Sequence, residues 1–228
     1  MTTPLRVGLM VPINNTTMER ELPAWLPAGS TCTTLRIPRG KGLLTAQTMP
    51  AYMAQALALA AGFAAHELDL IVYGCTAAGF IAGPAGDAQL AADLATVTGK
   101  PVVTTARSMV VALQAAGAAD IALVTPYLDP VNGQLTAFLA SGGIRVRRLA
   151  SFRAPDVDAL GRIGSDAVAG LARETMGPDC DALFIACSQL PTAAILDALA
   201  AECAPRPVSS SIRATAQQAC RVSGRQAP

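Results

Sequence analysis

Charged and aromatic residues are scarce in this sequence of 228 residues. Charged residues make up 14% of the chain and aromatic residues 4%, and the formal net charge is +1. Because no basic stripe is interleaved with aromatic residues, we expect no nucleic-acid partner. His66 is the only histidine and falls near the end of an expected helix, so Ser-His-Asp and Cys-His catalysis lack a general base.

Motifs for cofactors and metals are also missing. Lys41 and Lys100 are the only lysines, which leaves few candidates for a pyridoxal Schiff base. The chain contains neither G-x-G-x-x-G nor G-x-x-x-x-G-K-[ST], so nucleotide binding has no support. None of the six cysteines stands in a C-x-x-C pair, so zinc and redox motifs are unsupported. We therefore expect a protein that needs no cofactor and no metal.

Long apolar runs are absent as well, although 52% of the residues are hydrophobic. No stretch approaches the length of a membrane span, and the N-terminus lacks the apolar core of a secretion signal. We therefore expect a cytoplasmic protein with reduced thiols and no membrane partner. The length fits one large α/β domain or two small lobes.

Strand-like and helix-like segments alternate along the whole chain. Apolar runs rich in β-branched residues predict strands, and Ala- and Leu-rich segments predict helices between them. This alternation predicts an α/β fold, with mostly parallel sheets flanked by helices. The segment 83–86 (Gly-Pro-Ala-Gly) is expected to be a loop. The expected strands include 6–12, 32–37, 100–105, 120–125, 143–149 and 206–211, and the expected helices include 48–66, 87–98, 131–140 and 156–176.

Two further strands each end in a cysteine followed by a hydroxyl side chain. An apolar run at 70–73 leads through Gly74 to Cys75 and Thr76, where a helix should begin with Thr76 as a candidate cap. A second run at 182–186 leads in the same way to Cys187 and Ser188. Two such junctions predict two thiols that face a common cleft.

The sequence also repeats itself loosely. Residues 8–12 resemble 122–126, residues 73–76 resemble 185–188, and residues 100–107 resemble 206–213. Three matched segments in the same order indicate a duplication. We therefore predict two pseudo-symmetric Rossmann-like lobes with the active site at their interface, where ligand clefts commonly lie. The N-terminal lobe would comprise 1–99 and 207–228, and the C-terminal lobe 100–206.

The two junction cysteines carry the chemistry that the residues allow. A helix N-terminus favours the reactive thiolate, and the backbone N–H groups of Thr76, Ala77, Ser188 and Gln189 could hold a substrate carboxylate. Two opposed thiols could move a proton from one face of a small acid to the other. Alternatively, one thiolate could add to an activated double bond while the other thiol protonates the neighbouring carbon. A buried cysteine is more often a small hydrophobe, which is our interpretation of Cys32, Cys180, Cys203 and Cys220.

Several other residues have both a structural and a functional interpretation. Asn15 and Thr16 could bind substrate or cap a helix, since Thr16 and Glu19 have capping-box spacing. Tyr127 could bind substrate or pack in a turn with its hydroxyl in water. Segment 38–48, with its glycines and positive charges, is either a mobile lid over an anion or, the simpler account, a solvent-facing loop. Hydroxyl residues that we expect to cap helices are Thr104, Thr105, Ser209 and Ser210.

Paired cysteine loops on two duplicated α/β lobes resemble the Asp/Glu racemase superfamily. Three runs are most similar to the maleate cis-trans isomerases: 11–19 (Val-Pro-Ile-Asn-Asn-Thr-Thr-Met-Glu), 125–127 (Thr-Pro-Tyr) and 186–191 (Ala-Cys-Ser-Gln-Leu-Pro). Arylmalonate decarboxylases are similar around Tyr127 and Val131-Asn132 but have glycine at the position of Cys75. The run 74–77 (Gly-Cys-Thr-Ala) also resembles amino-acid and hydantoin racemases. Both cysteines together favour an isomerase or racemase over a decarboxylase.

The resemblance, which spans about 6–214, implies a specific reaction. Cys75 would add to C2 of maleate to give a succinyl thioether, and Cys187 would give and retake the proton at C3. Asn15, Tyr127 and the N–H groups after each cysteine would hold the two carboxylates. Alternatives are a two-thiol racemase of aspartate, glutamate or a hydantoin, an arylmalonate decarboxylase-like enzyme, and a two-lobed protein that binds a carboxylate without turnover. We further expect a small mono- or dicarboxylate as the substrate and a homo-oligomer, a dimer.

Overall fold

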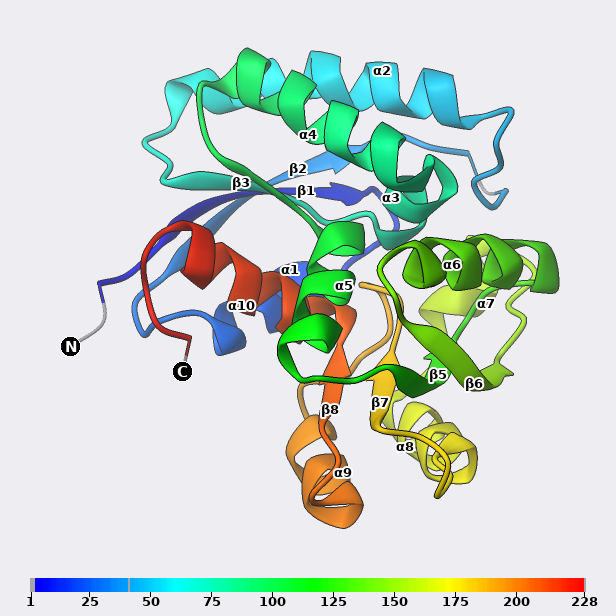
Figure 1. The fold of residues 1–228 in the computed structure, drawn as a ribbon. Coiled ribbons are helices and arrows are strands. Elements are labelled where there is room, and N and C mark those ends of the chain that lie inside the picture. Colours follow the sequence, from blue (N-terminus) through cyan, green and yellow to red (C-terminus); the bar gives the residue numbers. More distant parts are fainter. Residues whose placement is uncertain (1–2, 41, 228) are drawn as a thin grey trace.

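The structure is a computed structural model that describes residues 3–40 and 42–227. Within this part of the chain, eight strands form two parallel four-stranded sheets, in the orders β2-β1-β3-β4 and β6-β5-β7-β8 (Figure 1). The strands of the first sheet are β1 (Arg6–Pro12), β2 (Thr31–Ile37), β3 (Leu70–Tyr73) and β4 (Val102–Thr104). Those of the second sheet are β5 (Asp120–Thr125), β6 (Arg145–Ser151), β7 (Ala182–Ile185) and β8 (Val208–Ser210).

The two sheets have the same topology, which confirms the predicted α/β fold of two pseudo-symmetric lobes. In the first lobe β1 pairs with β2 on one side and β3 on the other, and in the second lobe β5 pairs with β6 and β7 in the same way. The central strands are buried along nearly their whole length, as expected for parallel strands covered on both faces.

Helices cover both faces of the first sheet. Apolar side chains of α2 (Met49–Ala60) and α4 (Gly83–Thr98) form one core with Met10, Ile71 and Tyr73. On the opposite face, α1 (Met18–Glu21) and α10 (Ser211–Val222) pack on Leu5, Val7, Leu9 and Val11. Short elements complete this lobe: η1 (Leu22–Trp25), η2 (Ala61–Ala65) and α3 (Thr76–Ile81).

The second sheet is covered in the corresponding way, by α5 (Thr105–Ala115), α6 (Asp129–Ser141), α8 (Ser165–Thr175) and α9 (Leu196–Cys203), with α7 (Val157–Gly161) beside them. Figure 1 shows α5 and α10 lying between the two sheets. None of the helices in the described ranges combines the length and the apolar character needed to cross a bilayer.

The chain crosses between the lobes twice, immediately after a short strand. Strand β4 pairs in the first sheet, and the helix that follows it, α5, contributes Ala106 and Met109 to the core of the second lobe. Strand β8 pairs in the second sheet, and α10 returns to the first. The boundaries expected at 99/100 and 206/207 place β4 in the C-terminal lobe and β8 in the N-terminal lobe, whereas each of these strands pairs in the sheet of the other lobe. The pairing supports boundaries after Thr104 and after Ser210.

Some expected elements differ in their ends or their caps. Residues 83–86 are the first turn of α4 rather than a loop, since Pro84 is accommodated there without needing its missing N–H. The predicted helix 156–176 is two helices, α7 and α8. Thr104 and Ser210 cap α5 and α10 as predicted, accepting hydrogen bonds from the N–H groups of Arg107 and Arg213.

Candidate active site

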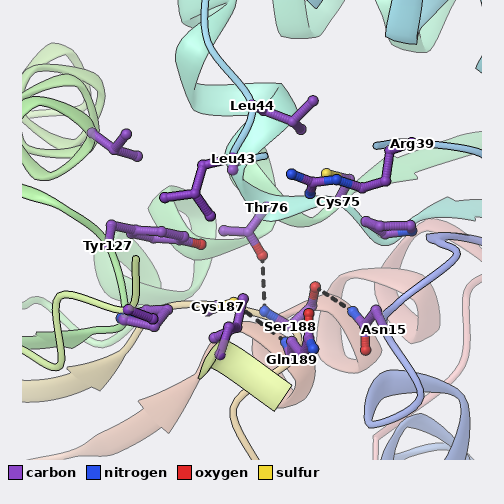
Figure 2. Close-up of a pocket in the computed structure, with 16 residues that line it drawn as sticks. Asn15, Arg39, Leu43, Leu44, Cys75, Thr76, Tyr127, Cys187, Ser188 and Gln189 are labelled. Atoms are coloured by element: carbon purple, nitrogen blue, oxygen red, sulfur yellow. Dashed lines mark hydrogen bonds between the residues drawn. The ribbon is translucent and has the colours of Figure 1, made fainter. Parts of the chain in front are cut away.

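The two junction cysteines lie at the carboxyl ends of equivalent strands and line one cavity. Cys75 is the residue before α3, after β3, and Cys187 follows β7. The side chains of both are almost fully buried. Both thiols therefore line one cavity at the lobe interface, as predicted. The cavity is lined by Pro12, Asn15, Arg39, Leu43, Leu44, Cys75, Thr76, Ala77, Pro126, Tyr127, Val131, Ala154, Leu160, Cys187, Ser188 and Gln189 (Figure 2).

Cys187 has a strained backbone, with φ of +150°, a region that L residues rarely adopt. The surrounding structure holds it there: the Cys187 N–H donates to Ser211 Oγ at 3.0 Å. The N–H of Gln189 in turn donates to the Cys187 sulfur at 3.4 Å. The loop therefore directs a backbone donor at the sulfur, and this donor favours the thiolate over the thiol.

Burial and mutual charge repulsion govern the protonation of the two sulfurs. Burial raises the pKa of Cys75, against the opposing effects of the Ala78 N–H, the Tyr52 hydroxyl and the Arg39 charge. Burial also raises the pKa of Cys187, and a negative charge on Cys75 raises it further. Because ionisation of one sulfur disfavours ionisation of the other, the second sulfur stays a thiol whenever the first is a thiolate. One nucleophile beside one proton donor is the state that either predicted chemistry needs.

The lobes are joined directly beside the cysteines by buried hydrogen bonds. The Ser188 N–H donates to Thr76 Oγ1 at 3.1 Å, and Ser188 Oγ donates to the Gly74 carbonyl at 2.6 Å. Asn15 Nδ2 donates to Ser188 Oγ at 3.0 Å (Figure 2). Thr76 is therefore not the cap of α3, since its hydroxyl instead accepts a hydrogen bond from the Ser188 N–H of the other lobe. The N–H of Ser188, predicted as a carboxylate donor, is already used in this junction.

Asn15 and Thr16 have different surroundings from each other. Asn15 is buried, and its Oδ1 accepts from the N–H groups of Thr17 and Met18, so it does the capping expected of the Thr16–Glu19 pair. Thr16 is exposed and does not line the cavity. The sequence signal misplaced the cap by one residue because Asn and Thr are both good caps.

Tyr127 is held with its hydroxyl in the cavity rather than in water. Its ring packs edge-on against Phe80 with 5.4 Å between ring centroids. Its hydroxyl is buried and has no hydrogen-bond partner within the described residues. Burial, together with the neighbouring Cys187, raises the pKa of Tyr127, so the phenol stays protonated and can donate. The loop is fixed from behind by Asn132, whose Nδ2 donates to the Tyr127 carbonyl at 3.0 Å.

The loop after β2 also contributes to the cavity, on the side of Cys75. Arg39, Leu43 and Leu44 lie over this cysteine in Figure 2. The lid interpretation of 38–48 rested on the glycines and positive charges of residues 39–42, Arg39 among them, and did not anticipate Leu43 and Leu44. Lys41 lies outside the described residues. Sequence reasoning also missed Val131, Ala154 and Leu160, which form the apolar wall on the second lobe. An isolated apolar residue in a helix or a loop carries no signal that distinguishes a cavity wall from ordinary packing.

The comparisons with known proteins agree with this geometry. A model of the arylmalonate decarboxylase family matches residues 7–227. The chain belongs to this family. A maleate isomerase of Geobacillus stearothermophilus is 27% identical over 199 residues, covering 82% of this chain and 79% of that protein. The arylmalonate decarboxylase of Bordetella bronchiseptica is 32% identical over 126 residues, which cover 54% of this chain and 51% of that enzyme.

Solved structures of family relatives have the same fold as this member. A cysteine-to-serine mutant of Nocardia farcinica maleate cis-trans isomerase, described with a covalently bound succinylcysteine intermediate, superposes with a TM-score of 0.86 at 27% identity, covering 96% of this chain and 92% of that one. A liganded arylmalonate decarboxylase mutant, with one glycine changed to cysteine and one cysteine to serine, gives a TM-score of 0.84 at 25% identity, covering 97% and 93% of the two chains. The resemblance inferred from the cysteine loops is thereby confirmed.

Proposed function

We propose that this protein is a cofactor-independent cis-trans isomerase of a small dicarboxylate, and that it converts maleate to fumarate. The observation that carries the proposal is the pair Cys75 and Cys187, which enter one cavity from equivalent positions of two lobes. The maleate isomerase relatives support it, as does the neighbour whose structure contains a succinylcysteine.

The reaction needs only the two sulfurs and a rotation. The Cys75 thiolate forms a bond to C2, the π-electron pair moves to C3, and C3 takes the proton of the Cys187 thiol. The C2–C3 single bond then rotates. The Cys187 thiolate removes a proton from C3, the double bond re-forms, and the Cys75–C2 bond breaks to return the Cys75 thiolate. No atom is gained or lost in the cycle.

Donors around the two cysteines would hold the carboxylates. The hydroxyl of Tyr127 lacks a partner within the described residues, and Asn15 Nδ2 uses one of its two hydrogens on Ser188. The main chain of Thr76 and Ala77 and the side chain of Gln189 complete the set. Because both donors of Ser188 are engaged in the lobe junction, we assign it to holding the cavity together rather than to binding substrate.

Arg39 is the one charged side chain that lines the cavity among the described residues. Its charge opposes the burial effect on Cys75, and a guanidinium attracts a dianion. We therefore assign Arg39 to two tasks on the same side of the cavity: stabilising the attacking thiolate and attracting the second carboxylate. Of the two interpretations of 38–48, a lid over an anion and a solvent-facing loop, this proposal adopts the anion-facing one and assigns it to Arg39.

NMR of maleate in deuterated buffer tests the proposal. The purified protein should consume maleate and produce fumarate, and Cys75→Ser and Cys187→Ser should each lose turnover by orders of magnitude. Cys180→Ser is the matched control, since Cys180 is buried but does not line the cavity. Retention of maleate binding without turnover in the wild-type protein would instead support a carboxylate-binding protein.

A second candidate function rests on the apolar wall of the cavity. Leu43, Leu160 and Val131 suit an apolar substituent better than a carboxylate. An acid with an apolar α-substituent, held between the same thiols, would be racemised by proton removal on one face and delivery on the other. The same NMR experiment distinguishes the candidates: α-deuteration of an amino acid, hydantoin or α-substituted acid indicates a racemase, and carbon dioxide release from an arylmalonate indicates a decarboxylase.

The expected homodimer and cytoplasmic location stay predictions. Sedimentation of the purified protein at several concentrations measures the first, and a dimer mass that persists on dilution would support it.

A further inference from the structure

A second tyrosine, outside the cavity lining, lies beside the nucleophilic cysteine. Tyr52 occupies the first turn of α2, which begins after the loop that leaves the carboxyl end of β2. In parallel βαβ units the helix that follows a strand starts at the same edge of the sheet where the strands end. Tyr52 and Cys75 therefore meet in the same apolar cluster, and both are nearly fully buried.

The hydroxyl of Tyr52 is buried, and none of the residues that the structure describes forms a hydrogen bond with it. A buried phenol without a partner costs free energy, so an apolar phenylalanine would suit this position better if the side chain only filled space. The Cys75 sulfur lies in the same buried cluster and can accept its proton, and the two groups each shift the pKa of the other.

We propose that Tyr52 donates a hydrogen bond to the sulfur of Cys75 when that sulfur is a thiolate, and thereby sets the reactivity of the nucleophile. Hydrogen bonds of catalytic groups are often poorly aligned in the free enzyme and tighten when charge develops. In the second lobe, Tyr127 and Cys187 line the same cavity, and the phenol of Tyr127 likewise lowers the pKa of Cys187, so each sulfur has one phenol from its own lobe. The inference rests on the proposed function only in taking Cys75 as the nucleophile.

Several other groups face Cys75, and the test has to separate their effects from that of Tyr52. Tyr73, on the strand that leads to Cys75, is the informative one. Its hydroxyl is also buried without a partner in the described ranges, and a negative charge on Cys75 raises its pKa, but it makes no hydrogen bond to the sulfur. The titratable groups that face Cys75 from the surrounding elements are Arg39, Tyr52, Tyr73, Tyr127 and Cys187.

The experiment is alkylation of Cys75 by iodoacetamide as a function of pH, followed by mass spectrometry of the peptide that contains it. Wild type, Tyr52→Phe and the matched control Tyr73→Phe are compared. This readout needs no substrate, so it stands even if maleate is not turned over. Thermal unfolding of all three proteins checks the fold, which should be unchanged because each substitution removes only a hydroxyl without a well-aligned hydrogen bond.

In Tyr52→Phe the midpoint of the alkylation profile should move to higher pH by about one unit, the usual strength of a charge-assisted hydrogen bond. A more basic thiolate is also more nucleophilic, so alkylation should be about threefold slower below both midpoints and about threefold faster above them. The two curves therefore cross, which neither a change in access nor a loss of packing produces.

Three results would overturn the inference. The first is a Tyr52→Phe profile that coincides with that of the wild type. The second is a uniform change in rate at every pH, which would mean that only access to Cys75 had changed. The third is an equal shift in Tyr73→Phe, which would mean that any phenol near the sulfur has the same effect. If maleate is not isomerised but the curves cross, the proposed function fails and the role of Tyr52 stands.

Discussion

Replacing Thr76 with valine tests the junction that brings the two cysteines together. The Thr76 hydroxyl accepts from the Ser188 N–H at 3.1 Å, and both residues are buried, with exposed fractions of 2% and 3%. Valine has nearly the same shape, so Thr76→Val leaves packing intact and strands one buried N–H. An unsatisfied buried donor costs about 1–3 kcal/mol. For a chain of this size that corresponds to a fall in Tm of roughly 2–12 °C.

Thermal and urea unfolding of Thr76→Val should be compared with Thr96→Val. Thr96 is exposed on α4 and its hydroxyl donates within the same helix, to the carbonyl of Ala92, so its replacement should change stability by less than about 0.5 kcal/mol. Thr76→Val should also lower kcat, since the Ser188 N–H is adjacent to Cys187 in the chain. If the two variants unfold at the same midpoint, the hydroxyl of Thr76 does not hold the lobes together and the account of the junction is wrong.

Three further substitutions test other parts of the account. Gly74→Ala would place a Cβ 2.7 Å from Met18 Sδ and 2.9 Å from Val11 Cγ1, so urea unfolding should show that the free energy of unfolding falls by about 1–3 kcal/mol. The control is Gly133→Ala, at an exposed helical position with open space around it, which should raise the free energy of unfolding by up to about 1 kcal/mol. Burial raises the pKa of Asp87 to about 6, so the native state holds its proton more tightly than the unfolded chain. Its contribution to stability is therefore complete below the unfolded pKa near 4 and lost as the pH rises through 6. The stability of wild type relative to Asp87→Asn should fall by about 2–3 kcal/mol between pH 4 and 7, and no change with pH would show that Asp87 ionises normally. Arg39→Gln should raise the KM for maleate several-fold. It should also move the acid limb of the kcat/KM profile to higher pH, because the cation that favours the Cys75 thiolate is gone. An unchanged KM and pH profile would show that Arg39 acts neither on the substrate nor on Cys75.

The sequence was sufficient to predict the lobes and the position of both cysteines. Those predictions depend on local patterns: an apolar run, then Cys75 or Cys187, then a hydroxyl residue at the start of the next segment. The repeat added the information that the two patterns are equivalent, and equivalent strands in duplicated lobes end at equivalent places. The structure confirms the fold, although the roles of the cysteines themselves stay proposals.

The hydrogen bonds across the junction could not be predicted in the same way. Thr76 follows the cysteine at a helix start, where a cap is the usual interpretation, and only the packing of the second lobe shows that its hydroxyl accepts from Ser188. Asn15 and Thr16 each have a substrate-binding and a capping interpretation in the sequence, but the backbone turn places Asn15 in the cavity wall and Thr16 outside it. The sequence places β4 and β8 each in the wrong lobe, because a strand pairs with partners far away in sequence and its own residues do not show which sheet it joins.

The walls of the cavity were the least predictable part. Leu160 and Ala154 come from the second lobe, and Leu44 from the loop after β2. None of these has a neighbouring motif, and an apolar side chain at a cavity surface is the same residue type as one in a core. Tyr52 was missed for a different reason, since one aromatic residue in an Ala-rich helix is normally read as packing, and its unpaired hydroxyl becomes evident only from the structure.

The central claim is that Cys75 forms a covalent bond to the substrate while Cys187 handles the proton. Mass spectrometry of Cys187→Ser, incubated with maleate and digested, tests this claim most directly. The account predicts one added maleate on the peptide that contains Cys75, and none on the same peptide of Cys75→Ser. An unmodified Cys75 peptide at saturating maleate, or an adduct on another cysteine, would contradict it.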